Sequence, residues 1–245
     1  MTGEHLPRPL EPGRVRELVA GARRPLLLLD YDGTLAPFRV ERDRAVPWPG
    51  VRERLAAILA AGGRVTIVTG RNPSDLPPLL GITPLPEIVG NHGLGDEPLP
   101  PGVARRLAEA ARRARARFPA ARVEVKPAGV AVHWRGDPVS REQEARSVLG
   151  PLAGDGLDLL PFAGGLELRA TAARKDRAVR RLAREADLVA YLGDDRTDED
   201  AFRAVPPGGL AVLVAPRPRR SAARWHLVPP GDLLAFLDAW REGLA

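Results

Sequence analysis

The hydrophobic pattern of this chain alternates between short, fully apolar runs and stretches whose apolar residues recur at helical spacing. Leu26 to Leu29 form the first apolar run, which predicts a buried strand. A helical pattern precedes it over 12–24, and a second helix is expected between Gly50 and Gly62. Strands that alternate with helices in this way predict a parallel sheet with right-handed crossovers.

The same alternation continues after these elements and returns at the end of the chain. Apolar runs predict further strands at 64–68, 87–89, 188–192 and 209–215. Helical spacing predicts helices at 174–185 and 232–241. Both ends of the chain are therefore expected to belong to one α/β domain.

The middle of the chain has a different pattern, in which a helix is followed by two strands and this order occurs twice. The expected elements are helices at 102–118 and 139–149 and strands at 122–126, 130–135, 157–161 and 166–169. This order predicts an open antiparallel sheet with helices on one face, formed by a small inserted α/β domain. We place the insert at 98–171, within a Rossmann-like core made of 1–97 and 172–245.

Composition excludes several classes of protein. The chain has 245 residues, 44% hydrophobic and 28% charged, so it is long and apolar enough for one or two globular domains. It has no cysteine, which excludes disulfides, thiolate catalysis and cysteine-ligated zinc. The sequence has neither a signal-peptide core nor a membrane-spanning apolar run. We expect a soluble, cytoplasmic monomer with no membrane partner.

The positive charge of the chain is a reason to consider nucleic acid as a partner. The net charge is +6 and the pI is about 10.7. However, the arginines of the run 112–117 are spread around a predicted helix without interleaved aromatic residues, which favours a solvated helix face. We expect no nucleic-acid partner, and a basic nucleic-acid-binding protein without catalysis is the remote alternative.

Polar residues directly follow the predicted strands of the parallel sheet. In chain order they are Asp30, Asp32, Thr34, Thr69, Arg71, Asn91, His92, Asp194, Asp195 and Asp198, with Gly70 between Thr69 and Arg71. Because ligands bind at the carboxyl ends of parallel strands, we expect a binding site at this edge of the sheet. A hard cation such as Mg²⁺ suits the carboxylates, since it prefers oxygen ligands.

The first predicted strand, 26–29, is followed by two carboxylates one residue apart. In an extended segment Asp30 and Asp32 point to the same side, so both could face one reacting centre. One could then act as a nucleophile while the other transfers a proton. A polar turn without catalysis is the alternative, because Asp-Gly pairs often form turns.

Paired polar residues also occur on the strands of the predicted insert. Glu124 and Lys126 lie two residues apart on one strand, and His133 and Arg135 do so on the next. Each pair is therefore expected on one face of its strand, and adjacent strands could merge the pairs into one patch. Such a patch either binds hydroxyl groups or faces solvent.

Taken together, the motifs resemble those of haloacid-dehalogenase-like phosphatases. The resemblance rests on Asp30-Tyr31-Asp32-Gly33-Thr34, Thr69-Gly70-Arg71, Lys175, and Gly193-Asp194-Asp195 with Asp198, in the usual order. More narrowly, the runs 29–37, 67–71, 91–94, 123–126, 133–135 and 191–202 resemble trehalose-6-phosphate phosphatases. This resemblance implies a Rossmann-like core with a small α/β cap, Mg²⁺ as cofactor and a small sugar phosphate as substrate.

The resemblance also implies roles for individual residues. Asp30 is implied to attack phosphorus and form an aspartyl-phosphate, and Asp32 to transfer the leaving-group proton. The implied Mg²⁺ ligands are Asp30, the backbone carbonyl of Asp32, and Asp194. The groups implied to stabilise the transferring phosphoryl group are Thr34, Thr69 and Lys175, and those implied to support metal and lysine are Asp195 and Asp198.

The implied substrate-binding residues lie in both predicted domains. They are Gly70, Arg71, Asn91, His92, Glu124, Lys126, His133, Arg135 and Glu167. Two positions depart from the family pattern, since Gly95 stands where glutamate is usual and Asp176 where glycine is usual. The implied reaction is hydrolysis of trehalose 6-phosphate to trehalose and phosphate, and another sugar or polyol phosphate is the alternative substrate.

Overall fold

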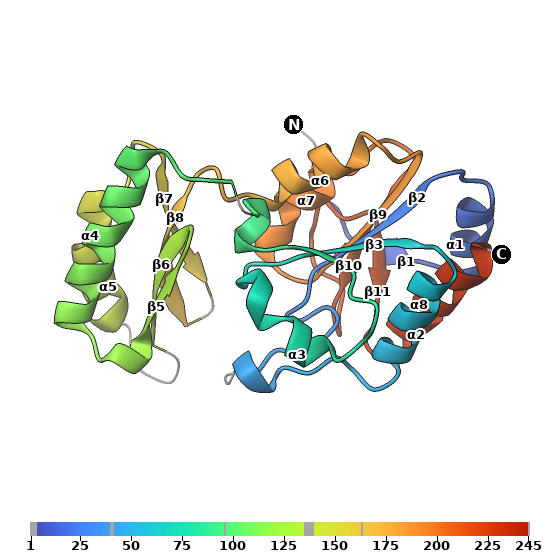
Figure 1. The fold of residues 1–245 in the computed structure, drawn as a ribbon, viewed down its shortest axis with the longest axis horizontal. Helices are drawn as coiled ribbons and strands as arrows, with labels where there is room; N and C mark the ends of the chain where they lie inside the picture. The colour runs from blue at the N-terminus through green and yellow to red at the C-terminus, as the bar shows by residue number, and fades with distance from the viewer. Residues whose placement is uncertain (1–3, 40–41, 96, 135–139, 163, 245) are drawn as a thin grey trace. The chain divides into compact units, whose positions relative to one another are not determined.

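The computed structural model describes residues 4–39, 42–95, 97–134, 140–162 and 164–244, and the chain divides into two compact units (Figure 1). The first unit consists of 1–95 and 174–245, and the second of 96–173. The chain leaves the first unit once and returns to it once, so the second unit is an insertion.

A parallel sheet forms the centre of the first unit. Within the described ranges its seven strands follow the order β1 (Arg8–Pro9), β11 (Trp225–Leu227), β10 (Leu210–Val214), β9 (Leu188–Gly193), β2 (Pro25–Leu29), β3 (Arg64–Val68) and β4 (Glu87–Val89). β3 and β4 lie on one side of β2, while β9, β10 and β11 lie on the other. The strand order therefore reverses between β2 and β9, where open α/β sheets bind ligands.

Helices cover both faces of this sheet. The helices on one face are α1 (Pro12–Ala20), α2 (Val51–Ala60), α3 (Pro77–Leu80) and α8 (Gly231–Gly243), and those on the other are α6 (Lys175–Ala183) and α7 (Glu199–Ala204). Leu27 and Leu29 of β2 belong to the first hydrophobic core, whereas Leu26 and Leu28 belong to the second. A strand buried on both faces has to be apolar at every position, which explains its unbroken run of leucines.

The second unit contains an antiparallel sheet with the strand order β5 (Val123–Lys126), β6 (Gly129–His133), β8 (Gly165–Ala170) and β7 (Leu157–Phe162). Its helices, α4 (Pro101–Arg117) and α5 (Ser140–Leu149), cover one face of the sheet (Figure 1). The apolar stripe of α4, which includes Val103, Leu107 and Ala110, is buried. The predicted parallel sheet and the predicted antiparallel sheet with helices on one face are both confirmed.

None of the helices in the described ranges combines the length and the apolar composition that a membrane span needs.

Two short strands were not predicted. The arginine- and proline-rich segment after the predicted strand 209–215 is typical of a loop. However, Trp225 to Leu227 form β11, which pairs in parallel with β10 on one side and with β1 on the other. Strands of two or three residues carry too little periodicity to be recognised, and here their pairing partners define them. The first helix also ends earlier than predicted, at Ala20, and β2 begins at Pro25.

Replacing Phe236 by alanine tests the packing of α8 against the sheet. Its side chain is 1% exposed and stacks on Trp240 with ring centroids 5.8 Å apart. We expect Phe236→Ala to lower the free energy of unfolding by about 3–5 kcal/mol, because it removes buried area and leaves a cavity. Urea denaturation measures this loss. Leu6→Ala is the control, since Leu6 is 63% exposed, and equal losses in both variants would contradict the assigned core.

Candidate active site

A buried lysine lies at the centre of the strand ends. Lys175, the first residue of α6, places its Nζ 2.8 Å from Asp30 Oδ1 and 2.7 Å from Asp198 Oδ1. The residue is 4% exposed. Burial works to lower the pKa of Lys175, but the carboxylates of Asp198 and Asp30 outweigh it and hold the pKa above its usual value. The ammonium is therefore a permanent positive charge.

Asp198 is surrounded by hydrogen-bond donors. Its Oδ1 accepts from Lys175 Nζ at 2.7 Å and from the hydroxyl of Tyr191 at 2.6 Å. Its Oδ2 accepts from the backbone N–H groups of Asp194 and Asp195 at 3.1 and 3.0 Å. Burial, and next the charge of Asp198, raise the pKa of Tyr191 well above its usual value, so the hydroxyl stays a donor. Asp198 thus fixes both the lysine and the backbone that follows β9.

Three carboxylates crowd around this single ammonium. Oxygen atoms of Asp30, Asp194 and Asp198 all lie within 4.8 Å of one another. When all three are ionised, three negative charges against one positive charge on Lys175 leave two negative charges uncompensated. Burial is the main cause that raises the pKa of Asp30 to about 7, with Lys175 opposing the rise and Asp198 adding to it. Burial, then Asp30 and Asp198, raise the pKa of Asp194 well above its usual value.

This arrangement fits a divalent cation. A charge of +2 would offset the two uncompensated negative charges, and hard cations bind carboxylate oxygens. Since donors already surround Asp198, the residues that could hold a metal ion are Asp30, at the end of β2, and Asp194, at the end of β9.

The turn after β2 packs tightly against Asp194. Gly33 has φ of +84°, and a Cβ added there would lie 1.9 Å from Asp194 Oδ2. The hydroxyl of Thr34, which is fully buried, donates to Asp194 Oδ1 at 3.3 Å. Only glycine combines this backbone conformation with so close an approach. The Asp-Gly-Thr sequence therefore brings the end of β2 directly against the end of β9.

The two carboxylates after β2 have different partners. Asp30 pairs with Lys175, whereas Asp32 accepts from Arg71 Nε at 2.7 Å and from Arg71 Nη2 at 2.5 Å. Arg71 is 3% exposed and lies over the ring of Tyr31, with 5.2 Å between its Cζ and the ring centroid. The expectation that both carboxylates point to one side assumed an extended segment. The chain instead turns, because the N–H groups of 35 and 36 both donate to the carbonyl of Tyr31.

The segments after β3 and β4 interlock. The N–H of Asn91 donates to the carbonyl of Arg71, and the N–H of His92 donates to the carbonyl of Thr69, both at 2.9 Å. Thr69 is buried, and its Oγ1 accepts from the N–H of Arg71 at 3.2 Å. A Cβ on Gly70 would lie 2.4 Å from the imidazole of His92, so this contact requires glycine. The structure thus brings the predicted residues of the second and third strand ends together.

Asp195 has a different environment from the one expected. It is exposed, and its Oδ1 accepts from the N–H of Arg196 at 2.5 Å, which caps the short 3₁₀ helix Arg196–Asp198. Its carboxylate does not belong to the described cluster around Lys175. Asp195 therefore supports the site through the helix that carries Asp198.

Three supporting residues were not predicted from the sequence. Tyr191 donates to Asp198, and the only clue to this was a hydroxyl within an apolar strand. Glu199 is 7% exposed and forms an ion pair with Arg219. Arg219 Nη2 in turn donates to the backbone carbonyl of Asp194 at 3.2 Å. The arginine-rich segment before β11 thus holds the end of β9 in place, a role that composition alone does not indicate.

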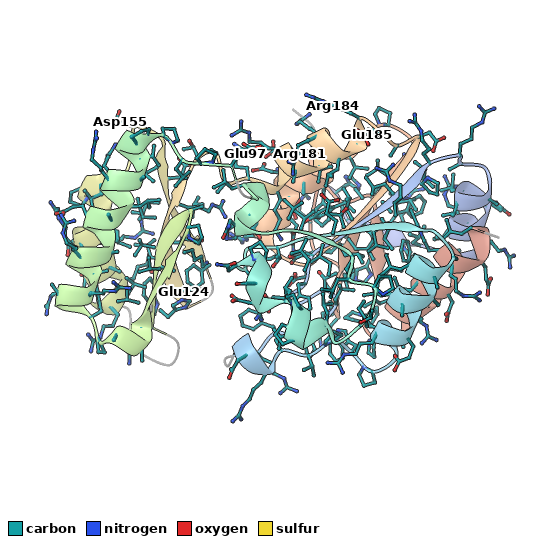
Figure 2. All side chains as sticks on the ribbon, viewed as in Figure 1. Glu97, Glu124, Asp155, Arg181, Arg184 and Glu185 are labelled. Carbon is teal, nitrogen blue, oxygen red and sulfur yellow. The ribbon has the colours of Figure 1, made fainter. Side chains whose placement is uncertain are left out.

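A second polar cluster lies on the sheet of the inserted unit. Lys126 Nζ is 3.0 Å from Glu167 Oε1 and 3.8 Å from Glu124 Oε2. His133 Nε2 is 3.0 Å from the same Glu124 oxygen. Figure 2 labels Glu124 on β5, and α4 and α5 lie on the other face of this sheet. These four residues therefore form one polar patch, and Arg135, the fifth predicted member, lies outside the described residues.

The family follows from a comparison of the whole chain with known families. Residues 28–227 match the trehalose-phosphatase family. The chain belongs to this family. The match includes both strand ends of the Asp30–Asp194 cluster and the entire inserted unit.

Individual members of the trehalose-phosphatase family are longer than this chain. A trehalose-phosphate phosphatase of Mycobacterium marinum is 34% identical over 240 residues, which cover 87% of this chain and 60% of that protein. A bifunctional trehalose-6-phosphate synthase/phosphatase of Thermoproteus tenax is 32% identical over 227 residues, covering 85% of this chain and 31% of that protein. The chain thus spans between about a third and three fifths of these relatives.

Solved structures show the same fold. Trehalose-6-phosphate phosphatase of Aspergillus fumigatus is 26% identical with a TM-score of 0.67, covering 96% of this chain and 99% of that one. The C-terminal domain of the Candida albicans enzyme is 20% identical with a TM-score of 0.78 over 97% of this chain and 99% of that one. A haloacid dehalogenase-like hydrolase of Bacteroides thetaiotaomicron, 16% identical, has a TM-score of 0.63 and covers 88% of this chain and 99% of that one. The trehalose-phosphatase chain therefore has the haloacid-dehalogenase-like fold.

The charge imbalance around Lys175 predicts how metal-free stability depends on pH. Folding raises the pKa of Asp30 from 3.8 to about 7, so the folded state favours the protonated carboxyl. The associated stability is complete below about pH 4 and is lost as the pH rises through about 7. In Asp30→Asn this loss is absent. Thermal melts in metal-free buffer should therefore show the variant gaining stability over the natural chain between about pH 5 and about pH 8.

The control for these melts is Glu17→Gln, since Glu17 is exposed and forms no ion pair with described residues. Its melting temperature should differ from that of the natural chain by a constant amount across this pH range. A constant difference for Asp30→Asn as well would contradict the charge imbalance.

Proposed function

We propose that this chain hydrolyses trehalose 6-phosphate to trehalose and phosphate. The observation that supports this most directly is the buried Asp30–Lys175–Asp198 group beside Asp194, at the strand reversal of a member of the trehalose-phosphatase family. A phosphatase needs a nucleophile and a way to offset the negative charge of the phosphate. This group offers a carboxylate, a permanent ammonium and a cation site within a few ångströms.

Mg²⁺ is the proposed cofactor. Asp30 and Asp194 would hold it through carboxylate oxygens, and the backbone carbonyl of Asp32 is the third ligand implied by the family resemblance. Bound there, the ion would offset the repulsion between an anionic nucleophile and a phosphate dianion, which amounts to about 4 kcal/mol per unit-charge pair at 4 Å and an effective dielectric near 20.

Asp30 is the proposed nucleophile. A bond forms between its carboxylate oxygen and phosphorus while the bond from phosphorus to the sugar oxygen breaks, which leaves an aspartyl-phosphate. Lys175, 2.8 Å from Asp30 Oδ1, would hold the carboxylate in its ionised form and in place. Thr34 and Thr69, both buried at the strand ends, would donate hydrogen bonds to the transferring phosphoryl group. Water then attacks the aspartyl-phosphate, releases phosphate and restores Asp30.

Asp32 is proposed to move the proton, and Arg71 to control when it does so. The leaving sugar oxygen needs a proton, which Asp32 would donate and later recover from the attacking water. Without substrate, the Arg71 guanidinium engages both oxygens of Asp32. A phosphate dianion competes for the same bidentate fork. Substrate bound to Arg71 would therefore release Asp32 for proton transfer.

The polar patch of the inserted unit is proposed to bind sugar hydroxyl groups. Its carboxylates, ammonium and imidazole supply donors and acceptors in one group, made of Glu124, Lys126, His133 and Glu167. Arg135 is included in this proposal from the sequence. A site built from such groups discriminates strongly against analogues that lack the hydroxyls, because its polar atoms then lose their partners. In the first unit, Gly70, Asn91 and His92 at the strand ends are also proposed to bind the substrate.

The reaction is tested by phosphate release from the purified chain with Mg²⁺. Trehalose 6-phosphate is compared with glucose 6-phosphate, sucrose 6-phosphate and mannosyl-phosphoglycerate. We expect strong preference for trehalose 6-phosphate and a loss of at least about 10³-fold in Asp30→Asn, because a nucleophile is removed. Asp155→Asn is the matched control, since Asp155 is exposed and lies in the second unit, outside the cluster. Equal activity in Asp30→Asn and the natural chain would contradict the proposed nucleophile. Preference for another phosphate would contradict trehalose 6-phosphate as the substrate.

Glu167→Gln tests the patch separately from the chemistry. Glu167 is 6% exposed and accepts from Lys126, and glutamine keeps its shape while it removes the charge. We expect KM for trehalose 6-phosphate to rise about tenfold or more, while kcat/KM for p-nitrophenyl phosphate, which has no sugar, stays unchanged. Glu109→Gln, on the outer side of α4 in the same unit, is the control. Equal effects on both substrates would argue against sugar recognition by the patch.

A further inference from the structure

We propose that the first unit binds a small polyphosphate, either free or as part of a nucleotide, in a second site that we call the basic hollow. This hollow has a volume of about 720 Å³ and is lined by His5, Arg8, Arg14, Arg203, Ala222, Arg224 and Trp225. None of these residues belongs to the candidate active site. The proposal is therefore independent of the proposed phosphatase activity.

Four separate parts of the chain converge on the basic hollow. Arg8 lies on β1, Arg14 on α1 and Arg203 on α7, while Arg224 and Trp225 lie at the start of β11. The N–H of Arg8 donates to the carbonyl of Arg224 at 3.1 Å, and Arg8 is opposite Trp225 in the sheet. Pairing of β1 with β11 therefore holds two of the arginines next to each other. Helices and strands, rather than loops alone, therefore position the arginines of the hollow.

The charge of the hollow is one-sided. Four guanidinium groups line it, and no carboxylate of a described residue does. Arg203 has carboxylate partners, Glu4 at 3.3 Å and Asp200 at 3.2 Å. By contrast, the guanidinium groups of Arg8 and Arg224 form no hydrogen bond or ion pair with any described residue. Positive charges that lie close together without counter-charges repel one another, and a bound anion would offset this repulsion.

The net charge of +6 does not by itself account for this feature. A neighbouring hollow shares Arg203 and contains three further arginines, yet it is also lined by Glu4, Glu199 and Asp200. Two of its arginines, Arg203 and Arg219, form ion pairs with these acids. Acidic residues therefore lie in the described lining of the neighbouring hollow but not in that of the basic hollow. The basic hollow is the one left with charge for a ligand.

Arg14 is oriented within the hollow by Trp225. Its Cζ lies 5.1 Å from the centroid of the indole ring. Such stacking fixes the plane of a guanidinium while its N–H groups stay available at the edges. Arg14 can therefore present a pre-oriented fork, which lowers the entropy lost when an anion binds.

The chemistry of the lining points to linked phosphates. Guanidinium forks bind phosphate oxygens in a bidentate manner, and four of them with a histidine suit several adjacent negative charges better than one phosphate does. The volume is within the usual range for small-molecule sites, roughly 300–1,000 Å³. A single-stranded nucleic acid is favoured by a row of aromatic platforms, whereas this lining has only Trp225. The hollow therefore fits a compact polyphosphate better than an extended strand.

Binding is measured on the full chain in buffer freed of divalent cations with a chelating resin. Inorganic triphosphate and ATP are titrated separately by calorimetry, and tryptophan fluorescence is followed in parallel. We expect saturable binding that Arg8→Glu with Arg224→Glu weakens about tenfold or more, because two charge-assisted contacts are lost. The control is Arg105→Glu with Arg115→Glu, two exposed arginines of α4 that form no ion pair with described residues. Trp225→Phe should remove the fluorescence change.

The two ligands identify the source of the phosphates. Similar affinity for both indicates that the phosphate chain alone is recognised, and much tighter ATP binding indicates a nucleotide. Circular dichroism checks that each double variant is folded. The proposal is overturned if neither ligand binds saturably, if both double variants weaken binding equally, or if a single-stranded oligonucleotide displaces triphosphate more effectively than ATP does.

Discussion

The buried ammonium of Lys175 is the interaction on which the rest of the site depends. A charge in a protein interior is costly unless it is paired, and this one is paired twice, with Asp30 and with Asp198. Those partners come from the end of β2 and from the 3₁₀ helix after β9. The three segments must therefore converge for the first unit to fold without an unpaired charge. The positions of Asp30, Lys175 and Asp198 are in this sense a condition of folding.

This convergence requires a stiff framework around it, which the sheet supplies. β2 is buried on both faces, so neither of its ends can shift without disturbing two hydrophobic cores. Close approaches at Gly33 and Gly70 leave the strand-end turns no room to move closer together. Arg219 adds a further restraint through the carbonyl of Asp194. Groups held in this way lose little entropy when a ligand binds, which is the basis of preorganisation.

The protein leaves charge uncompensated at three separate places. The cluster around Lys175 has more carboxylates than ammonium groups, which suits a divalent cation. The patch of the inserted unit places Lys126 between Glu124 and Glu167, which leaves one negative charge in excess when both are ionised. Its mixture of hydrogen-bond donors and acceptors suits neutral, hydroxyl-rich ligands. The basic hollow has the opposite excess, which suits a polyanion. The ligand class expected at each place follows from the sign and the size of the charge left uncompensated there.

Local patterns in the sequence are enough to predict the alternation of strands and helices, the insertion, and the strand ends at which Asp30, Thr69 and Asp194 lie. These features are local, since apolar periodicity and turn residues act within a few positions. The pairing of Asp32 with Arg71 and the hydrogen bond from Tyr191 to Asp198 become visible only in the folded chain. The tertiary structure also defined β1 and β11, whose few residues are strands only because they have partners. Such choices depend on contacts between distant parts of the chain, such as Thr34 with Asp194, 160 positions apart, and no local pattern encodes them.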